Sequence, residues 1–164
     1  MEKSSENLKQ AFAGESQANR RYLAFAEKAD QECYHQVARL FRAAAEAETV
    51  HAMNHLKALK AIGATLNNLK EAISGETTEF REMYPGMIAA AQAEGHREAL
   101  RSFEFANEVE KVHAQLFQKA LTNLEKKELV EVYVCTICGY TVEGEPPEQC
   151  PICNSIKKFF KKID

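Results

Sequence analysis

The sequence FRAAAEAETVHA at residues 41–52 recurs as FEFANEVEKVHA at residues 103–114. Phe, Ala, Glu, Glu, Val, His and Ala stand at the same offsets in both copies, which predicts two copies of one helix. Each copy contains Glu-x-x-His, as Glu48 with His51 and as Glu110 with His113. Because residues three apart lie on one face of a helix, each pair is placed to bind one metal ion.

The duplication separates these pairs from an ordinary surface motif. A single Glu-x-x-His is usually a solvated pair and indicates a metal only weakly. Phe41 and Phe103 lie seven residues before the two glutamates and share roughly their helical face, which favours inward-facing acids. A buried carboxylate needs a partner, and a metal ion is the favoured one. Glu46 and Glu108 stand two residues before the candidate ligands, point elsewhere and are expected to be solvated.

A third candidate carboxylate comes from a predicted helix hairpin over residues 4–63. The run Asp30-Gln31-Glu32 breaks the apolar periodicity, so the turn is expected near Gln31. Glu15 lies 16 residues before Gln31 and Glu48 lies 17 after it. An antiparallel hairpin therefore brings Glu15 and Glu48 to the same height.

The second half of the chain repeats this geometry. Gly95 is a predicted helix terminator, with Glu79 and Glu82 16 and 13 residues before it and Glu110 15 after it. Residues 66–74 are expected to form a short helix within a connection that crosses alongside the bundle. Pro85 is expected to kink its helix and to loosen the backbone near Glu82.

The predicted ligand layer then combines five carboxylates with two imidazoles: Glu15, Glu48, His51, Glu79, Glu82, Glu110 and His113. Five carboxylates need the positive charge of two metal ions, because two ferrous ions bring four charges and two ferric ions bring six. Oxygen-rich ligation with two imidazoles suits iron or manganese and argues against a closed zinc site of the thiolate type.

The C-terminal tail carries a separate metal signal. Two Cys-x-x-Cys knuckles, Cys135 with Cys138 and Cys150 with Cys153, are separated by eleven residues and predict a tetrahedral metal site. A disulfide pair is the disfavoured alternative, since the N-terminus lacks the apolar core of a secretory signal and a reducing cytoplasm is expected. Residues 131–134 alternate as in a short strand, and so small a domain needs its metal to fold.

Together these motifs resemble the rubrerythrin family over nearly the whole chain. The resemblance rests on Glu15, Glu48-x-x-His51, Glu79-x-x-Glu82-Met83-Tyr84-Pro85, Glu110-x-x-His113, Cys135-x-x-Cys138-Gly139-Tyr140 and Cys150-Pro151-x-Cys153. It implies an all-α, ferritin-like four-helix bundle with a di-iron site at residues 1–125, a linker at 126–131, and a rubredoxin-like domain with one iron at 132–164. It also implies a peroxidase of the NADH peroxidase type that reduces hydrogen peroxide to water in oxidative stress defence.

Roles for the candidate residues follow from this resemblance. Glu48 and Glu110 are expected to bridge the irons, Glu15 and Glu79 to be terminal ligands, and His113 to hold the second iron. The first iron is expected to take Glu82 when oxidised and His51 when reduced, which makes these two the catalytic pair. Electrons are expected to return through the four-cysteine iron, from another subunit's tail in a head-to-tail homodimer, and to be fed by a rubredoxin or a reductase.

Two residues depart from the family pattern. Thr136 replaces the usual proline of the first knuckle, and Asn154 replaces the usual glycine of the second. Asparagine tolerates a left-handed turn, so iron binding is expected to survive. His55 is interpreted as a neighbour of the site, Tyr22 as a core tyrosine or a ligand partner, and Cys33 as an incidental thiol.

Composition agrees with this picture and leaves one alternative function open. The 164 residues carry a net charge of −3, which disfavours a nucleic-acid-binding zinc ribbon, and no segment approaches transmembrane length. The lysines near the C-terminus are expected to form a solvated face. Four thiolates also accept zinc. The alternative is therefore a ferritin-like ferroxidase or iron-handling protein with a structural zinc ribbon.

Overall fold

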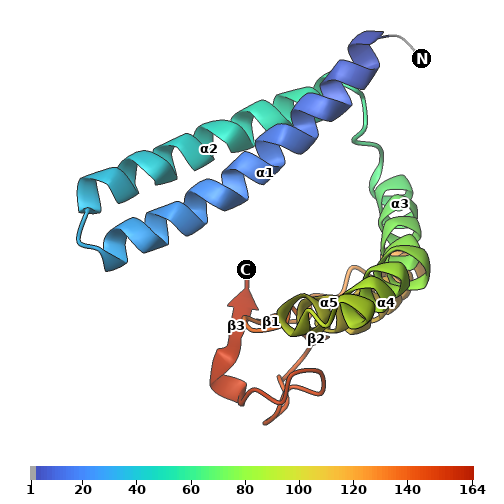
Figure 1. Ribbon diagram of the computed structural model, residues 1–164. Helices are drawn as coiled ribbons and strands as arrows, with labels where there is room; N and C mark the ends of the chain where they lie inside the picture. Colours follow the sequence, from blue (N-terminus) through green and yellow to red (C-terminus); the bar gives the residue numbers. More distant parts are fainter. Residues whose placement is uncertain (1–2) are drawn as a thin grey trace. The chain divides into compact units, whose positions relative to one another are not determined.

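The computed structural model describes residues 3–164, which divide into two compact units (Figure 1). The first ends at Gly63 and the second is Ala64–Asp164. The first unit is a helix hairpin, and the second combines a helical part with a small antiparallel sheet at its C-terminal end. The predicted class, mostly helical with a small C-terminal metal domain, is confirmed. The predicted division at residues 125 and 132 stays a prediction.

The hairpin of the first unit is formed by α1 (Lys3–Gln31) and α2 (His35–Ala58). The turn follows Gln31, as predicted, and Cys33 occupies it with a left-handed φ of 64°. The buried side chains are all alanines, which let the two helices approach closely: Ala18, Ala26, Ala29, Ala38, Ala45 and Ala52. Asn19 fixes the register, because its side-chain amide donates to the Ala45 carbonyl at 2.7 Å and lies 2.9 Å from Thr49 Oγ1.

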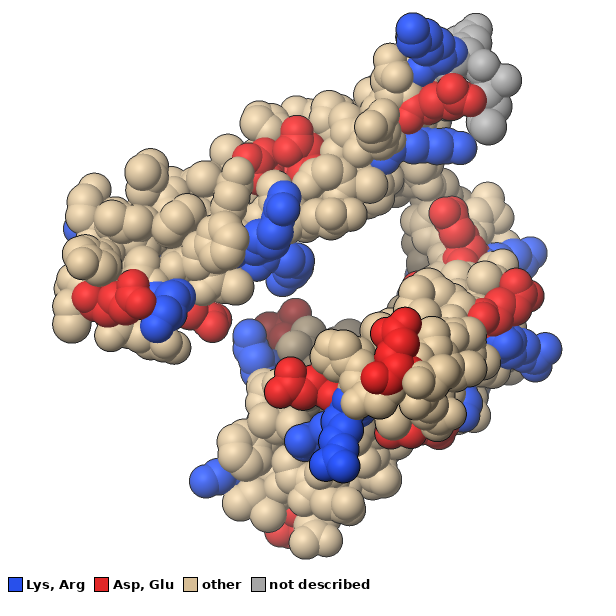
Figure 2. Space-filling view, viewed as in Figure 1, with Lys and Arg blue, Asp and Glu red and all other residues tan. Residues whose placement is uncertain are grey.

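Larger apolar side chains of the hairpin stay at its surface. Leu23, Phe25, Leu40, Val50 and Met53 are all more than one third exposed. The space-filling view shows mostly uncharged residues over much of this hairpin (Figure 2). A pair of helices joined by alanines buries little apolar area, so packing within the hairpin contributes little hydrophobic stabilisation.

In the second unit, one helical run is interrupted by a π-helical turn. It comprises α3 (Thr65–Thr78), the π-turn η1 (Glu79–Met83) and α4 (Tyr84–Glu94). Pro85 stands in the first turn of α4. A proline has no backbone N–H and cannot close the α-helical bond to the preceding turn. The helix therefore widens at the place where the sequence predicted an irregularity, and π-turns frequently mark functional sites.

The helix expected at residues 66–74 is confirmed, but the crossing connection around it is wrong. These residues lie inside α3, which continues past Gly75 toward the π-turn, and only residues 59–64 connect α2 to α3. A glycine inside a helix costs about 1 kcal/mol relative to alanine and does not by itself end the helix. Gly95, in contrast, has φ 68° and terminates α4, as predicted, before α5 (Arg97–Thr122) begins.

The tail forms a three-stranded antiparallel sheet with the order β2-β1-β3. Its strands are β1 (Val132–Cys135), β2 (Thr141–Glu143) and β3 (Phe160–Ile163), and the short turns η2 (Leu124–Lys126) and η3 (Lys157–Phe159) precede β1 and β3. Gly139 and Asn154 follow the second cysteine of each knuckle with φ of 86° and 60°. Asparagine therefore adopts the left-handed conformation expected of it. No helix within residues 3–164 is long and apolar enough to cross a membrane.

Candidate metal centres

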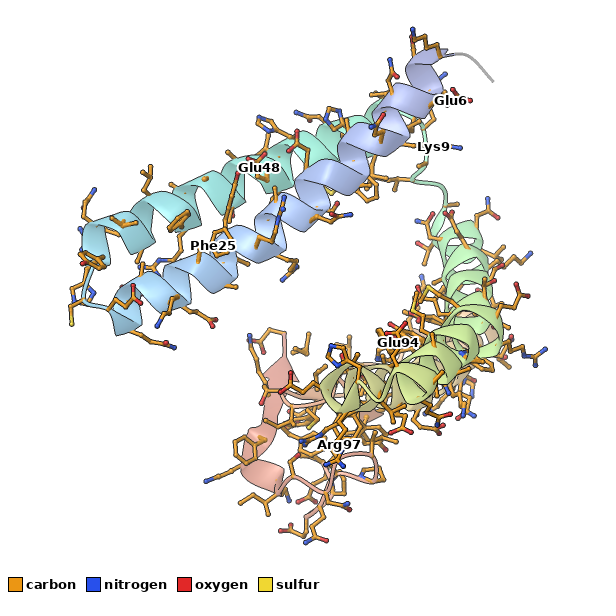
Figure 3. All side chains as sticks on the ribbon, viewed as in Figure 1. Glu6, Lys9, Phe25, Glu48, Glu94 and Arg97 are labelled. Atoms are coloured by element: carbon orange, nitrogen blue, oxygen red, sulfur yellow. The ribbon has the colours of Figure 1, made fainter. Side chains whose placement is uncertain are left out.

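One group of potential metal ligands lies on the first hairpin. Glu15 of α1 and Glu48 and His51 of α2 offer ligand atoms that all lie within 4.8 Å of one another. His51 Nδ1 is 3.0 Å from Glu48 Oε2, which confirms that the i, i+3 spacing places both on one face. Figure 3 labels Glu48 on α2. The predicted equal height of Glu15 and Glu48 is confirmed, because the alanine contacts and Asn19 fix the hairpin register.

The second unit contains a matching group. Glu76 of α3 and Glu110 and His113 of α5 also place their ligand atoms within 4.8 Å of one another. His113 Nδ1 lies 2.7 Å from Glu110 Oε2 and 3.9 Å from Glu76 Oε1. The three side chains are half-buried. Each copy of the repeated helix therefore holds its Glu-x-x-His pair next to a third carboxylate from a neighbouring helix.

Crowded carboxylates raise the proton affinity of the second group. Burial, and then the hydrogen bond and negative charge of Glu110, raise the pKa of Glu76 to about 7. Burial and the charge of Glu110 also raise the pKa of Glu79, although His113 opposes this effect. Burial and the same acids raise the pKa of Tyr84. A bound cation would remove this repulsion, so the donor set fits a metal ion.

Glu76 is the residue that sequence reasoning missed. It takes the position in the second group for which Glu79 and Glu82 were predicted. Glu79 is half-buried and within electrostatic reach of Glu110 and His113. Glu82 is exposed and lies outside both groups. The available signal was that Glu76 and Glu79 are three residues apart, as Glu79 and Glu82 are, so either pair shares a helical face.

The neighbouring residues behave largely as the sequence indicates. Glu46 and Glu108, the repeated acids that point away, are exposed. His55 belongs to neither ligand group. Tyr22 packs its ring against Phe25 and Phe41, at 6.3 and 6.1 Å between centroids, and is therefore part of an aromatic cluster.

The four tail cysteines converge as predicted. Cys135 Sγ lies 3.7 Å from Cys153 Sγ, and Cys138 Sγ lies 3.5 Å from Cys150 Sγ. These distances exclude disulfides, whose sulfurs are about 2.05 Å apart. A tetrahedral metal with bonds of about 2.3 Å separates its sulfurs by roughly 3.8 Å. The geometry therefore fits a four-thiolate metal site.

The surroundings of the four cysteines lower the pKa of one thiol and raise the pKa of two others. Burial acts to raise the pKa of Cys135, but hydrogen bonds from Ser155 and from the amides of Ile137 and Cys138 outweigh it and lower the pKa to about 6. Burial raises the pKa of Cys138 and of Cys150. Four thiolates this close need a cation, which lowers thiol pKa values at metal sites.

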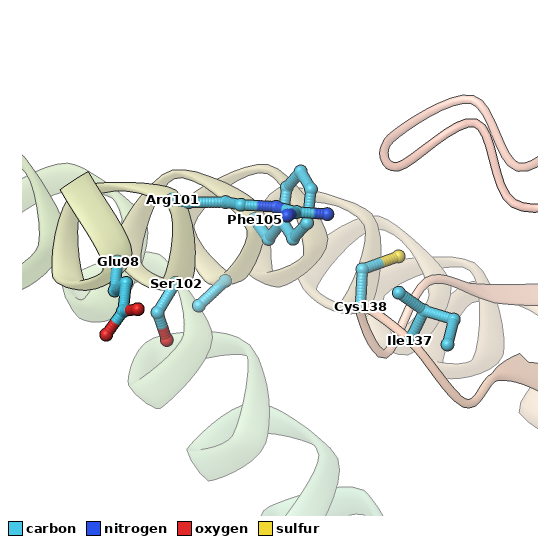
Figure 4. Close-up of a pocket in the computed structure, with 7 residues that line it drawn as sticks. Glu98, Arg101, Ser102, Phe105, Ile137 and Cys138 are labelled. Carbon is cyan, nitrogen blue, oxygen red and sulfur yellow. The ribbon is translucent and has the colours of Figure 1, made fainter.

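Within the second unit, the tail packs directly on α5. Lys119 of α5 pairs with Glu143 of β2, and His113 Nε2 lies 2.9 Å from Thr141 Oγ1. A cavity of about 490 Å³ opens between α5 and the first knuckle (Figure 4). It is lined by Glu98, Arg101, Ser102, Phe105, Ala106, Ile137 and Cys138. The four-cysteine site and the second ligand group therefore share one compact unit.

Comparison with known families agrees with both sites. The rubrerythrin family matches residues 6–121, and the rubredoxin-like domain of rubrerythrin matches residues 133–161. The chain belongs to the rubrerythrin family. The chain therefore carries a di-iron site of glutamate and histidine and a rubredoxin-like four-cysteine site.

Individual relatives cover almost the whole chain. Rubrerythrin-2 of Clostridium acetobutylicum is 39% identical, over 94% of this chain and 93% of the relative. Nigerythrin of Nitratidesulfovibrio vulgaris is 37% identical, over 94% of this chain and 84% of its own. Solved structures of nigerythrin in a mixed-valent state and in a fully reduced, all-ferrous state each cover 99% of this chain and 88% of their own, at 34% identity and a TM-score of 0.59.

Proposed function

We propose that this rubrerythrin is a non-haem di-iron peroxidase that reduces hydrogen peroxide to water. The observation that carries the proposal is the duplicated ligand group, Glu15, Glu48 and His51 in one unit and Glu76, Glu110 and His113 in the other. Each group would hold one metal ion with its carboxylates and its histidine, as the Glu-x-x-His motifs do in di-iron carboxylate bundles. The solved structures of nigerythrin in mixed-valent and all-ferrous states support iron as the metal.

The proposed ligand roles keep most of those expected from the sequence. Glu48 and Glu110 would each hold a metal ion together with the histidine of their own motif, which lies beside them, and the bridging role expected of both acids stays part of the proposal. Glu15 is a terminal ligand. Glu76 and Glu79 would be the terminal and adjustable acids of the second unit, because Glu76 belongs to the ligand group and Glu79 lies within electrostatic reach of Glu110 and His113. Glu82 stays a candidate for the adjustable role, to be separated from Glu79 by experiment.

The protein residues supply charge, orientation and protons around the metals. When bound, two ferrous ions supply the two electrons that, with two protons, convert one peroxide into two waters. The acids neutralise the ions and hold them in place. Tyr84 is able to donate a hydrogen bond at neutral pH, because a tyrosine hydroxyl is protonated there, and burial and the neighbouring acids raise its pKa further. Glu79 and Glu82 lie in the π-turn Glu79–Met83, a helix segment that is irregular and therefore easier to rearrange.

Electrons are proposed to return through the four-cysteine iron. The contact between the tail and α5 within the second unit supports this relay, since it brings the four-cysteine domain onto the helix that carries Glu110 and His113. The expected donor is a rubredoxin or an NADH-dependent reductase. The four free tail thiols fit a reducing cytoplasm. The proposal includes a head-to-tail homodimer or higher homo-oligomer in which the tail serves the di-iron site of another subunit.

The deciding experiment compares two substrates. The anaerobically reduced, iron-loaded protein is mixed with hydrogen peroxide or with oxygen, and oxidation of the reduced centre is followed by stopped-flow absorbance. Peroxide is expected to oxidise it faster than oxygen and in a ratio of one peroxide per two electrons. Oxidation by oxygen alone, with iron released or accumulated as mineral, would instead identify a ferroxidase.

The ferroxidase alternative with a structural zinc ribbon is supported by one observation. The sulfur distances of the tail suit zinc as well as iron, because both bind four thiolates tetrahedrally. A ferric tetrathiolate absorbs in the visible and zinc does not. Purified protein with a colourless and fully metallated tail would therefore remove the electron relay from the proposal.

A further inference from the structure

The ring nitrogen of His113 that faces away from the acids contacts the tail. Nε2 lies 2.9 Å from Thr141 Oγ1, and the same hydroxyl lies 3.1 Å from the carbonyl oxygen of Gly139. A hydroxyl has one proton to donate, and a carbonyl oxygen only accepts. Thr141 therefore donates to Gly139 and accepts from His113, which requires a proton on Nε2.

The protonated Nε2 determines what the other ring nitrogen presents. A neutral imidazole with its proton on Nε2 carries its lone pair on Nδ1. Nδ1 lies 2.7 Å from Glu110 Oε2, inside the ligand group. Two acceptors this close need a proton or a cation between them, and a bound metal ion would take that place. Histidines that bind metals usually donate their second N–H to a fixed acceptor, which orients the ring. The acceptor for His113 is a side chain of the four-cysteine domain.

We propose that Thr141 is a positioning residue for the di-iron centre: its hydroxyl holds His113 with Nδ1 toward the metal and docks the four-cysteine domain on α5. The inference rests on the proposed function for the identity of the ion, but not for the hydrogen bond. It also names a connection between the two sites. Cys138 is bonded to Gly139, whose carbonyl accepts from Thr141, which accepts from His113.

Two further contacts show that Thr141 lies in the middle of an interface. Thr141 and Glu143 are at alternate positions of β2, so their side chains lie on one side of that strand. A Cβ atom on Gly139 would stand 3.7 Å from Cγ1 of buried Val109, four residues before His113 on α5. Glu143 pairs with Lys119. A side chain without a hydroxyl at Thr141 would leave these two contacts in place and remove the hydrogen bond to His113.

The test uses the full chain with zinc in the tail, no metal in the ligand groups, and ¹⁵N-labelled histidine. Wild type, Thr141→Val and Thr141→Ser are compared by NMR, with His113→Gln identifying the His113 signals. Wild type and Thr141→Ser are expected to show a protonated Nε2 whose exchange with solvent is slow. Thr141→Val is expected to exchange that proton roughly tenfold faster.

A matched control separates the hydroxyl from general damage to the tail. Thr136 donates its hydroxyl to the Phe159 carbonyl at 2.9 Å within the same domain, so Thr136→Val should leave the His113 signals unchanged. Should Thr141→Val prevent folding of the tail, Thr141→Ala replaces it with the same measurement. Exchange equal to wild type in the folded variant would overturn the proposal, as would failure of Thr141→Ser to restore protection.

Ferrous iron provides the second measurement. Anaerobic titration should show roughly 10–100-fold weaker binding at the His113 side in Thr141→Val, with recovery in Thr141→Ser. Equal affinity in all three proteins would refute the positioning role. A wild-type protein that binds no iron here, or does not reduce peroxide, would defeat the proposed function while leaving the proton-exchange result readable.

Discussion

His113 Nδ1 lies 2.7 Å from Glu110 Oε2, and this pair repeats in the other unit, where His51 Nδ1 lies 3.0 Å from Glu48 Oε2. In each pair, the glutamate and the histidine are three residues apart on one turn of the repeated helix. A solvated i, i+3 pair has no reason to recur with a third carboxylate within 4.8 Å each time. The recurrence therefore indicates that each copy of the helix belongs to a metal-binding group.

Replacement of one proposed bridging acid tests this assignment. Glu110→Ala is expected to lose most iron from the glutamate and histidine groups, because a bridging carboxylate contacts both ions. The colour of the four-cysteine iron should remain. Iron analysis combined with the visible spectrum measures both, and Glu108→Ala, which removes an exposed acid two residues away, is the control. Unchanged iron stoichiometry in Glu110→Ala would refute the site.

The electron relay is tested by a variant of the tail. Cys150→Ser should abolish steady turnover with an external donor while a chemically reduced di-iron centre still reacts once with peroxide. Stopped-flow absorbance after chemical reduction follows that single reaction. Cys33→Ser, which changes the exposed cysteine of the α1–α2 turn, should leave both steady turnover and the single peroxide reaction as in wild type. Loss of the single reaction in Cys150→Ser would show that the tail is needed for more than electron delivery.

The sequence predicted the parts of the site that depend on regular structure. The pairs Glu48 with His51 and Glu110 with His113 follow from helical spacing, and Glu15 follows from the hairpin turn at Gln31. The four cysteines follow from knuckle spacing. In each case the backbone between the residues is a regular helix or a short turn, so counting residues is enough.

The sequence could not locate Glu76, because the helix between it and Gly95 is not regular. Counting back from Gly95 at 3.6 residues per turn assumes an α-helix across Glu79–Met83, where the structure has a π-turn. The wider turn shifts every earlier residue around the helix axis. The contact between His113 and Thr141 was also beyond sequence reasoning, since it depends on how the tail docks on α5.

The raised pKa of Glu76 predicts a pH dependence of stability in protein freed of metal. The unfolded chain releases this proton near pH 4.5 and the folded chain near pH 7. Between these values the folded state holds a proton that the unfolded state has lost, so stability decreases as pH rises. The contribution is complete below about pH 4.5 and absent above about pH 7.

Thermal unfolding from pH 5 to 7.5 measures this effect. The midpoint of wild type should fall with rising pH more steeply than that of Glu76→Gln, whose amide does not ionise. Bound metal should reduce the pH dependence of the wild-type midpoint, since a cation replaces the proton between Glu76 and Glu110. Parallel curves for the two metal-free proteins would contradict the assigned interaction.

Two matched variants separate the candidates for the adjustable ligand. Glu79 is half-buried and near Glu110, whereas Glu82 is exposed and one turn further along the helix. Glu79→Gln is expected to weaken iron retention and slow peroxide reduction, while Glu82→Gln should resemble wild type. Iron content and single-turnover rates decide between them. The opposite ranking would return the role to Glu82 and indicate that the π-turn rearranges when metal binds.

The redox switch itself is tested at His51, which is more exposed than its counterpart His113, with 54% against 26% of the side chain accessible. An exposed imidazole is free to move toward or away from an ion, whereas His113 is held by Thr141. A ferric ion favours the extra carboxylate, and a ferrous ion accepts a neutral imidazole. His51→Ala should therefore spare the diferric centre, weaken retention of ferrous iron and slow peroxide reduction. Crystals of the oxidised and reduced protein give the direct check, because an iron that keeps the same ligands in both states would exclude the switch without excluding the peroxidase.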